Sequence, residues 1–342
     1  MKVIIDGKDL VLADLADFDI KQTLECGQCF NFVRTDAGTD SSFCAYKIIA
    51  GGRVLFVSQT IHDKSSGYID GSSSDSLQDY TSRGCNLTLY DTSFEDYEIF
   101  WKRYFDIETD YGRIKKEIIK ACPELEEVIR ENPGIRLLHQ EYFETLISFI
   151  ISQNKQIPQI KAVVRQLSEM AGRKIESEII KLYKNGLISD DFLKRESNCI
   201  DDFSITSYCF PTIEEMNRLS EDDIRACKAG FRAPYIMDAV RRTISGEITE
   251  DSFKGLSTDE ARQLLMKIKG VGEKVANCVL LFGLGRREAF PVDVWMKRIM
   301  EDIYFHKDTP KDVIEAFATD RFGEYAGYAQ QYLFIYGKNK LK

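Results

Sequence analysis

The hydrophobic pattern of this chain changes near Ser93, and that change limits the fold more than any other sequence feature. Before it, β-branched and aromatic residues gather in short runs bounded by Gly, Asp and Ser, which is typical of antiparallel strands. These runs are residues 2–6, 30–34, 45–50 and 54–60, with Gly51 and Gly52 as a hairpin turn. After it, apolar residues recur every three or four positions, as Tyr97, Phe100, Trp101 and Tyr104 do. We therefore predict an α+β fold: an N-terminal antiparallel β-sheet followed by a mostly α-helical region.

Length and composition fit a folded protein of two or three modules. The chain has 342 residues, 44% hydrophobic and 30% charged, and this excludes disordered and collagen-like classes. No fixed-period repeat is visible, and no apolar run reaches the roughly 20 residues that a membrane span needs. Residues 64–84 are rich in Ser, Gly and Asp and predict a surface loop to which we assign no function.

The cysteines argue for a reducing compartment and against a metal centre. Nine cysteines are scattered along the chain, which is typical of a cytoplasmic or otherwise intracellular protein. Cys26 and Cys29 form one CxxC, but no second CxxC follows and only three histidines are present. Zinc would normally need two further ligands at similar spacing. We expect no iron-sulfur cluster and no required cofactor.

A net charge of −9 excludes a basic footprint over the whole molecule. Basic residues nevertheless cluster locally, which permits a small anion-binding surface. The clusters are Lys267, Lys269 and Lys274; Lys228, Arg232, Arg241 and Arg242; and Arg286, Arg287, Lys297 and Arg298. If the partner is nucleic acid, we expect few phosphate contacts and a shallow dependence of binding on salt.

A helix, a glycine hairpin and a second helix are predicted over residues 258–283. Ser257 and Glu260 form a capping box that starts the first helix, which should stop at Gly270. Gly270 and Gly272 can supply positive φ and a close backbone approach. The second helix would then begin with unpaired N–H groups and a positive dipole end, a site suited to one phosphate. Taken alone, such a hairpin is more often an ordinary helix ending.

Six ordered motifs make the chain resemble the 8-oxoguanine DNA glycosylases of the helix-hairpin-helix, Gly/Pro-Asp (HhH-GPD) superfamily. They cover most of the chain from about Gly134 onward, and C-G-Q-C-F at residues 26–30 extends the resemblance to the sheet. The motifs are K-G-V-G-E-K-V-A-N-C (269–278), P-V-D-V (291–294), I-R-L-L-H-Q (135–140), S-F-I-I-S-Q-N (148–154), G-F-R-A (230–233) and Y-A-G-Y-A-Q (325–330). The resemblance implies a TBP-like sheet domain at 1–110 and a helical HhH-GPD region at 111–342.

The chemistry of such enzymes matches two residue types in these motifs. Breaking a purine glycosidic bond needs a nucleophile at the anomeric carbon and negative charge near the developing cation. Lys274 would supply the amine, and its place in the first helical turn disfavours the ammonium form. Asp293 would supply the charge while also capping the following helix. A lysine Schiff base with the sugar would permit strand cleavage by β-elimination, so the predicted enzyme is bifunctional. We expect it to act on double-stranded DNA and to be a monomer.

The resemblance also implies how the damaged base is held after it leaves the duplex. Asn154 would fill its vacated place, Phe231 would wedge beside the estranged base, and Arg232 would hydrogen-bond that base. The pocket residues implied are Gly27, whose carbonyl would read N7–H of the oxidised purine, Cys278 and Phe334 around its faces, and Gln330 at its Watson–Crick edge. Remaining contacts to DNA are implied for Gly270, Gly272 and Trp295, and a structural cation for the carbonyls of Met266, Ile268 and Val271.

Several positions depart from the family pattern. Lys155 and Gln156 follow Asn154 where the eukaryotic members have an Asn triplet, and Gln159 stands in place of a second arginine. Trp295 replaces a histidine, and Gly337 stands where an acidic residue is expected. We therefore predict weak selectivity for the base opposite the lesion.

Two other functions share parts of this pattern. A non-catalytic DNA-binding module would keep the hairpin without needing Lys274, Asp293 and a base pocket together. A glycosylase for another damaged purine is the second alternative, and a relative that acts on alkylpurines would usually lack the hairpin lysine, which is Lys274 here. Relatives of endonuclease III commonly carry four cysteines after the hairpin, and none follows Cys278 here.

Overall fold

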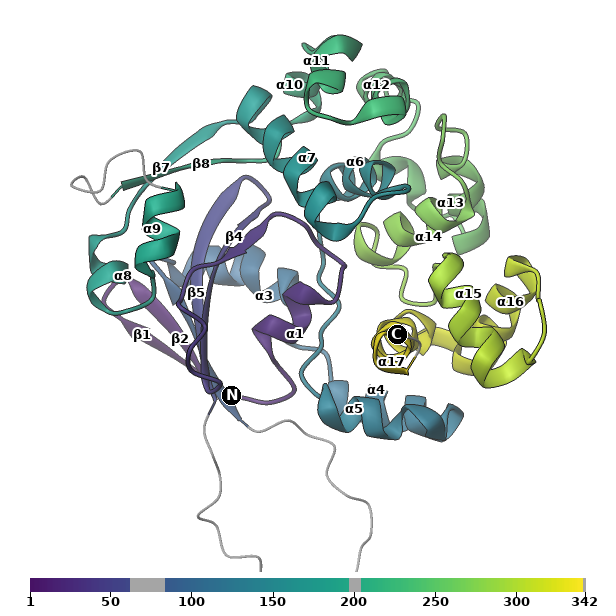
Figure 1. The fold of residues 1–342 in the computed structure, drawn as a ribbon, viewed down its shortest axis with the longest axis horizontal. Coiled ribbons are helices and arrows are strands. Elements are labelled where there is room, and N and C mark those ends of the chain that lie inside the picture. The colour runs from purple at the N-terminus through teal and green to yellow at the C-terminus, as the bar shows by residue number, and fades with distance from the viewer. Residues whose placement is uncertain (62–83, 197–203, 341–342) are drawn as a thin grey trace, which may run out of the picture.

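A computed structural model describes residues 1–61, 84–196 and 204–340 of the chain. It confirms the α+β class: a six-stranded antiparallel sheet is followed by a mostly helical region (Figure 1). Most of the Ser/Gly/Asp-rich segment, for which we predicted a surface loop, lies outside the described residues. None of the described helices is both long and apolar enough to cross a membrane.

The sheet contains all four predicted strands and two that the sequence did not reveal. Its strands are β1 (Lys2–Asp6), β2 (Asp9–Leu15), β3 (Phe32–Arg34), β4 (Phe43–Ala50), β5 (Arg53–Ile61) and β6 (Cys85–Tyr90), in the order β1-β2-β6-β5-β4-β3. The register of β2 on β6 shifts between Leu12 and Leu15, with Asp14 at positive φ between them. This irregularity interrupts the alternation that marks a strand in sequence.

The predicted turn at Gly51 and Gly52 is confirmed. It joins β4 to β5, whose pairing ends at Ala50 opposite Arg53, and both glycines have positive φ, 55° and 71°. Two-residue hairpin turns favour this backbone. At Gly51 a side chain is also excluded by space, because a Cβ would lie 2.3 Å from the Phe100 ring.

Helices account for most of the remaining chain. Near the sheet they are α1 (Ile20–Glu25), α2 (Phe94–Asp96) and α3 (Lys102–Tyr104), and beyond it α4 (Tyr111–Ala121), α5 (Glu126–Glu131), α6 (Tyr142–Ser152), α7 (Ile157–Ala171), α8 (Ile180–Lys184), α9 (Asp190–Glu196), α10 (Ile213–Met216), α11 (Glu221–Ala226), α12 (Ala233–Ile244), α13 (Thr258–Leu265), α14 (Glu273–Phe282), α15 (Val294–Met300), α16 (Lys311–Phe322) and α17 (Ala326–Lys340). One large apolar core joins most of the helices from α4 onward, and a second, to which α1 and α3 contribute, lies against the sheet.

The helical region also contains a β-ribbon that we did not predict. Strands β7 (Lys174–Glu178) and β8 (Ser204–Tyr208) pair antiparallel, and α8 and α9 lie in the sequence between them. Apolar side chains of this insertion, including Leu182 and Phe192, form one cluster with Ala45 and Phe56 of the sheet. The insertion therefore packs onto the N-terminal sheet, although it belongs to the helical part of the sequence (Figure 1).

The extended segment 135–140 connects the sheet domain to the helices. The guanidinium of Arg136 is buried and donates to the backbone carbonyls of Asp17 (2.8 Å) and Asp106 (2.6 Å). Gln140 donates to the carbonyl of Gln28 at 2.7 Å, and the Gln28 side chain accepts from the N–H of Leu138 at 2.9 Å. The I-R-L-L-H-Q motif thus fixes the loop that carries Gly27.

Candidate active site

The predicted hairpin joins α13 to α14. The capping box is confirmed, since the N–H of Ser257 donates to the Glu260 carboxylate at 2.8 Å. The first helix ends at Leu265 rather than at Gly270, because the N–H groups of Lys267 and Ile268 turn to carbonyls three residues back. The helix is therefore four to five residues shorter than predicted.

Only one of the two hairpin glycines needs to be glycine for its backbone. Gly270 has a φ of +78°, and a Cβ there would lie 2.2 Å from the Tyr235 ring. Gly272 instead has a φ of −100° and caps α14, with open space where a side chain would be. The prediction of positive φ is thus confirmed at Gly270 and wrong at Gly272. An open cap leaves room for an anion to approach the first N–H groups of α14.

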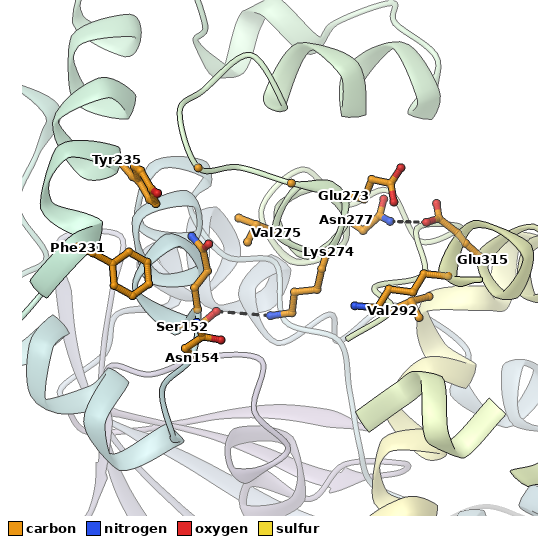
Figure 2. Close-up of a pocket in the computed structure, with 14 residues that line it drawn as sticks. Ser152, Asn154, Phe231, Tyr235, Glu273, Lys274, Val275, Asn277, Val292 and Glu315 are labelled. Carbon is orange, nitrogen blue, oxygen red and sulfur yellow. Dashed lines mark hydrogen bonds between the residues drawn. The ribbon is translucent and has the colours of Figure 1, made fainter. Parts of the chain in front are cut away.

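Lys274, the second residue of α14, points across to α6. Its Nζ lies 3.5 Å from the hydroxyl of Ser152, the last residue of α6 (Figure 2). The same Nζ lies 5.1 Å from the centroid of the Phe149 ring. Neither Ser152 nor Phe149 was singled out in the sequence, because nothing local connects residues more than 120 positions before Lys274 to its amine. Their place within the S-F-I-I-S-Q-N motif was the available signal.

A cavity of about 370 Å³ brings together all six residues predicted for catalysis and base binding. They are Gly27, Lys274, Cys278, Asp293, Gln330 and Phe334. The volume lies within the roughly 300–1,000 Å³ of small-molecule sites. Gly27 has a φ of +92°, so the loop at this wall favours glycine. Burial raises the pKa of the Cys278 thiol, which therefore stays neutral against the cavity.

A second cavity, of about 530 Å³, adjoins the first and shares Ser152 and Lys274 with it. Its wall includes the predicted DNA contacts Asn154, Phe231, Gly270 and Gly272 (Figure 2). Phe231 is 49% exposed, which is unusual for a large apolar side chain. Asn154 follows the end of α6 with a φ of 51°. Lys274 therefore lies between the two cavities. We call the larger one, lined by the DNA-binding candidates, the outer cavity, and the smaller one the base cavity or inner cavity.

Two residues of the predicted DNA interface lie elsewhere. Arg232 is buried and donates to the carbonyls of Gln153 and Ala229, so its guanidinium holds the loop that precedes Asn154. Trp295 lines neither of the two cavities. It packs beside Gly337, where a Cβ would lie 3.2 Å from the indole nitrogen. The two departures from the family pattern, Trp295 and Gly337, are therefore in contact with each other.

The basic clusters divide into structural and exposed residues. Arg286 donates to the carbonyls of Phe253 and Leu256, and Arg287 donates to those of Leu137 and Leu281, so both stabilise loops. Four other residues of the predicted clusters are exposed and form no ion pair with another described residue: Lys228, Lys267, Lys269 and Arg298. Lys311, which we did not predict, lines the outer cavity.

The fold and the site define a helix-hairpin-helix protein with a lysine and an aspartate facing a base-sized cavity. A family model described as HhH-GPD superfamily base excision DNA repair protein matches residues 147–322. Another, described as 8-oxoguanine DNA glycosylase, N-terminal domain, matches residues 10–146. The chain belongs to the HhH-GPD superfamily of base excision DNA repair proteins.

Individual relatives agree with the family assignment. The probable N-glycosylase/DNA lyase of Methanothermobacter thermautotrophicus is 31% identical over 71% of this chain and 74% of its own length. The Clostridium acetobutylicum 8-oxoguanine glycosylase/lyase, solved with dsDNA containing cytosine opposite 8-oxoG, is 31% identical with a TM-score of 0.79 and covers 100% of this chain and 99% of its own. MBOgg1 in complex with low affinity DNA ligand is 35% identical with a TM-score of 0.80 at the same coverage.

Proposed function

We propose that this chain is a bifunctional 8-oxoguanine DNA glycosylase and AP lyase of base excision repair. The observation that carries the proposal is the position of Lys274, which lines both the base-sized cavity and the outer cavity. A nucleotide turned out of a duplex on the outer surface would bring its sugar to the lysine as its base enters the inner cavity. Relatives named as N-glycosylase/DNA lyases and 8-oxoguanine glycosylases support this substrate and reaction.

Base recognition falls to the inner cavity. The Gly27 carbonyl would accept from N7–H, which 8-oxoguanine has and guanine lacks. Cys278 and Phe334 would lie against the two faces of the purine, and Gln330 would bond its Watson–Crick edge. In the outer cavity the exposed ring of Phe231 would replace lost stacking, and Asn154 would offer a donor and an acceptor to the unpaired position.

The reaction follows from the positions of Lys274 and Asp293. The neutral amine attacks C1′, the C1′–N9 bond breaks, and the leaving base takes the bonding electrons and a proton. The carboxylate of Asp293 stabilises positive charge on the sugar while this bond breaks. The nitrogen lone pair then expels O4′ from C1′, O4′ takes a proton from solvent, and a protonated Schiff base remains between Nζ and C1′. Loss of a proton from C2′ expels the 3′ phosphate and cuts the strand.

Borohydride trapping on an 8-oxoguanine duplex tests this function. We expect a covalent adduct with the native chain and none with Lys274→Gln. The matched control is Lys254→Gln, at a lysine whose side chain is 78% exposed and lines neither cavity, and it should trap normally. DNA binding without any adduct would favour a non-catalytic module. An adduct formed equally on duplexes with another damaged purine would favour a broader substrate class.

The remaining expectations complete the proposal. We infer a monomer that acts inside the cell, where its DNA substrate is, with the bacterial cytoplasm or nucleoid as the finer assignment. No cofactor is needed for the chemistry above. Within the described residues, no group of three or more His, Cys, Asp or Glu side chains is placed to hold a metal. A structural cation would instead use backbone carbonyls at Met266, Ile268 and Val271, in the turn between α13 and α14.

A further inference from the structure

A third cavity, of about 620 Å³, is lined by other residues of α7 than those that line the base cavity. Its walls come from β3, β4, α7, α9 and β8, so the inserted ribbon and the sheet close it together. Phe30 is the one residue that it shares with the base cavity, and it shares none with the outer cavity. The repair reaction proposed above assigns no role to this cavity.

One face of α7 supplies a charged wall. The lining residues of this helix recur at helical spacing, on the side away from its buried apolar residues. They are Pro158, Lys161, Ala162, Arg165, Ser168 and Glu169. Lys47 from β4 and Arg195 from α9 add to the basic side chains, and Glu196 is the second carboxylate. Four basic groups therefore face two acidic ones, and the cavity carries an excess of positive charge.

The acidic groups are already paired, and Lys161 is not. Glu196 lies 3.2 Å from Lys47 Nζ and 3.5 Å from Arg165, and Glu169 lies 2.6 Å from Arg165. No carboxylate of the described residues lies within ion-pair distance of Lys161. Its Nζ instead lies 3.3 Å from the centroid of the Phe32 ring and donates to the Phe32 carbonyl at 3.4 Å. An aromatic face and a carbonyl are weaker partners for an ammonium than an anion is.

Two buried hydroxyls in the same wall also lack partners. Ser168 on α7 and Ser207 on β8 are 3% and 2% exposed, and neither Oγ has a hydrogen-bond partner among the described residues. Buried hydroxyls are normally hydrogen-bonded, because a buried polar group without a partner is not compensated for its lost hydration. Both serines line the cavity, so a bound polar molecule is the available partner.

We propose that this cavity binds a planar aromatic anion of nucleoside monophosphate size. Lys161 would pair with the phosphate, the aromatic and aliphatic side chains of β3 and β4 would contact the ring system, and the serine hydroxyls would bond its polar edge. The cavity is larger than the one we assign to a single purine, which favours a nucleotide over a free base or inorganic phosphate. A bound nucleotide would touch Phe30, whose ring meets Phe149 edge-on at 5.6 Å.

Isothermal titration calorimetry with guanosine 5′-monophosphate tests the proposal on the full-length chain. We expect binding at least tenfold tighter than that of guanosine or inorganic phosphate. Lys161→Met should weaken it at least tenfold, and Ala162→Trp, which fills the cavity from the exposed side of α7, should do the same. Lys120→Met is the matched control, because the Lys120 side chain is 81% exposed on α4, and it should bind like the native chain.

A nucleotide could also enter the base cavity, and Cys278→Trp separates the two sites. We expect this variant, in which the base cavity is filled, to bind the nucleotide within threefold of the native chain. Loss of binding in Cys278→Trp together with normal binding in Lys161→Met would overturn the proposal, as would no detectable binding at millimolar concentration. Equal affinity for inorganic phosphate and for the nucleotide would overturn the proposal that the cavity recognises an aromatic ring system. A melting curve for each variant shows that it is folded, and none of these readouts depends on repair activity.

Discussion

The carboxylate of Asp293 accepts a hydrogen bond of 2.6 Å from the backbone N–H of Met296, so the residue proposed to stabilise the sugar cation also caps α15. These two roles make different demands on the side chain. The cap needs an oxygen acceptor, which Asn supplies nearly as well as Asp. Stabilisation of a cation needs negative charge, which Asn lacks.

Two substitutions at Asp293 separate these roles. Asp293→Asn should leave the free energy of unfolding within a few tenths of a kcal/mol and reduce base excision by about 100-fold or more. Asp293→Ala should lose excision similarly and also about 1 kcal/mol of stability. Urea denaturation and single-turnover excision measure the two effects. Normal excision by the Asn variant would contradict the electrostatic role, and a large stability loss in that variant would contradict the cap.

The exposed ring of Phe231 predicts a substitution that affects DNA binding without affecting the fold. Phe231→Ala should weaken binding of an 8-oxoguanine duplex by about tenfold or more, since stacking on a base contributes roughly 1–3 kcal/mol. The free energy of unfolding should change by less than about 0.5 kcal/mol, as is usual for substitutions at exposed positions. Phe94, an aromatic residue of similar exposure (47%) at the start of α2, provides the control. If Phe94→Ala and Phe231→Ala bind the duplex equally well, Phe231 is no wedge.

The small number of exposed basic residues near the hairpin predicts a shallow salt dependence of DNA binding. Lys228, Lys267, Lys269 and Arg298 are exposed, and with Lys311 they allow about five phosphate contacts. The slope of log K against log salt should then be about −4.5, near −0.9 per contact. Lys269→Gln should reduce its magnitude by about one, and Lys254→Gln should not change it. Fluorescence anisotropy measures the slope, and a value steeper than about −7 would contradict this prediction.

The sequence predicted local features well and long-range contacts poorly. The capping box at Ser257 and the cap at Asp293 depend on neighbours three residues away, so their spacing is visible in sequence. One partner of Arg232 is the carbonyl of Gln153, 79 positions earlier, and no local pattern reveals it. By residue type alone Arg232 could serve DNA or backbone equally well, and in the structure described here it bonds the backbone.

The resemblance to the glycosylase family predicted contacts between distant residues that the spacing of residues along the chain could not predict. Gly27 and Phe334 lie at opposite ends of the chain, yet a Cβ on Gly27 would lie 4.0 Å from the Phe334 ring. No periodicity predicts that contact, whereas the resemblance to the family implied that both residues lie at the base. The ribbon β7–β8 was missed for a different reason: burial alternates along both strands, but each strand is short and contains one aliphatic residue, Ile175 or Ile205, so the hydrophobicity of its sequence gives little signal.

Position 159 predicts weak discrimination of the base opposite the lesion. Gln159 is exposed, and its amide oxygen accepts from the N–H of Gln156 at 3.1 Å to cap α7. An arginine that forks onto a base edge contributes about 1–3 kcal/mol of discrimination, and Arg232 is already bonded to Gln153. Single-turnover excision opposite C, T, G and A should therefore vary by less than about tenfold. A preference for C above about 100-fold would contradict this prediction.

Asp106 predicts how stability depends on pH at the junction of the two parts of the chain. Burial alone would raise the pKa of this carboxyl, but hydrogen bonds with His139, Thr109 and Tyr111, with Arg287 nearby, lower it to about 2. Because the folded pKa lies below the ordinary 3.8, the charged carboxylate stabilises the fold above about pH 4. That contribution, about 2 kcal/mol, is lost as the pH falls toward 2.

Asp106→Asn tests that contribution. The variant should unfold about 2 kcal/mol more easily than the native chain at pH 7, and the difference should shrink steadily between pH 5 and pH 3. The control Asp251→Asn, at a side chain that is 79% exposed, should differ little from the native chain at any pH. Urea titrations at several pH values measure the difference. If the difference in free energy of unfolding between the native chain and Asp106→Asn stays constant from pH 7 to pH 3, Asp106 stabilises the fold through packing and neutral hydrogen bonds rather than through its charge.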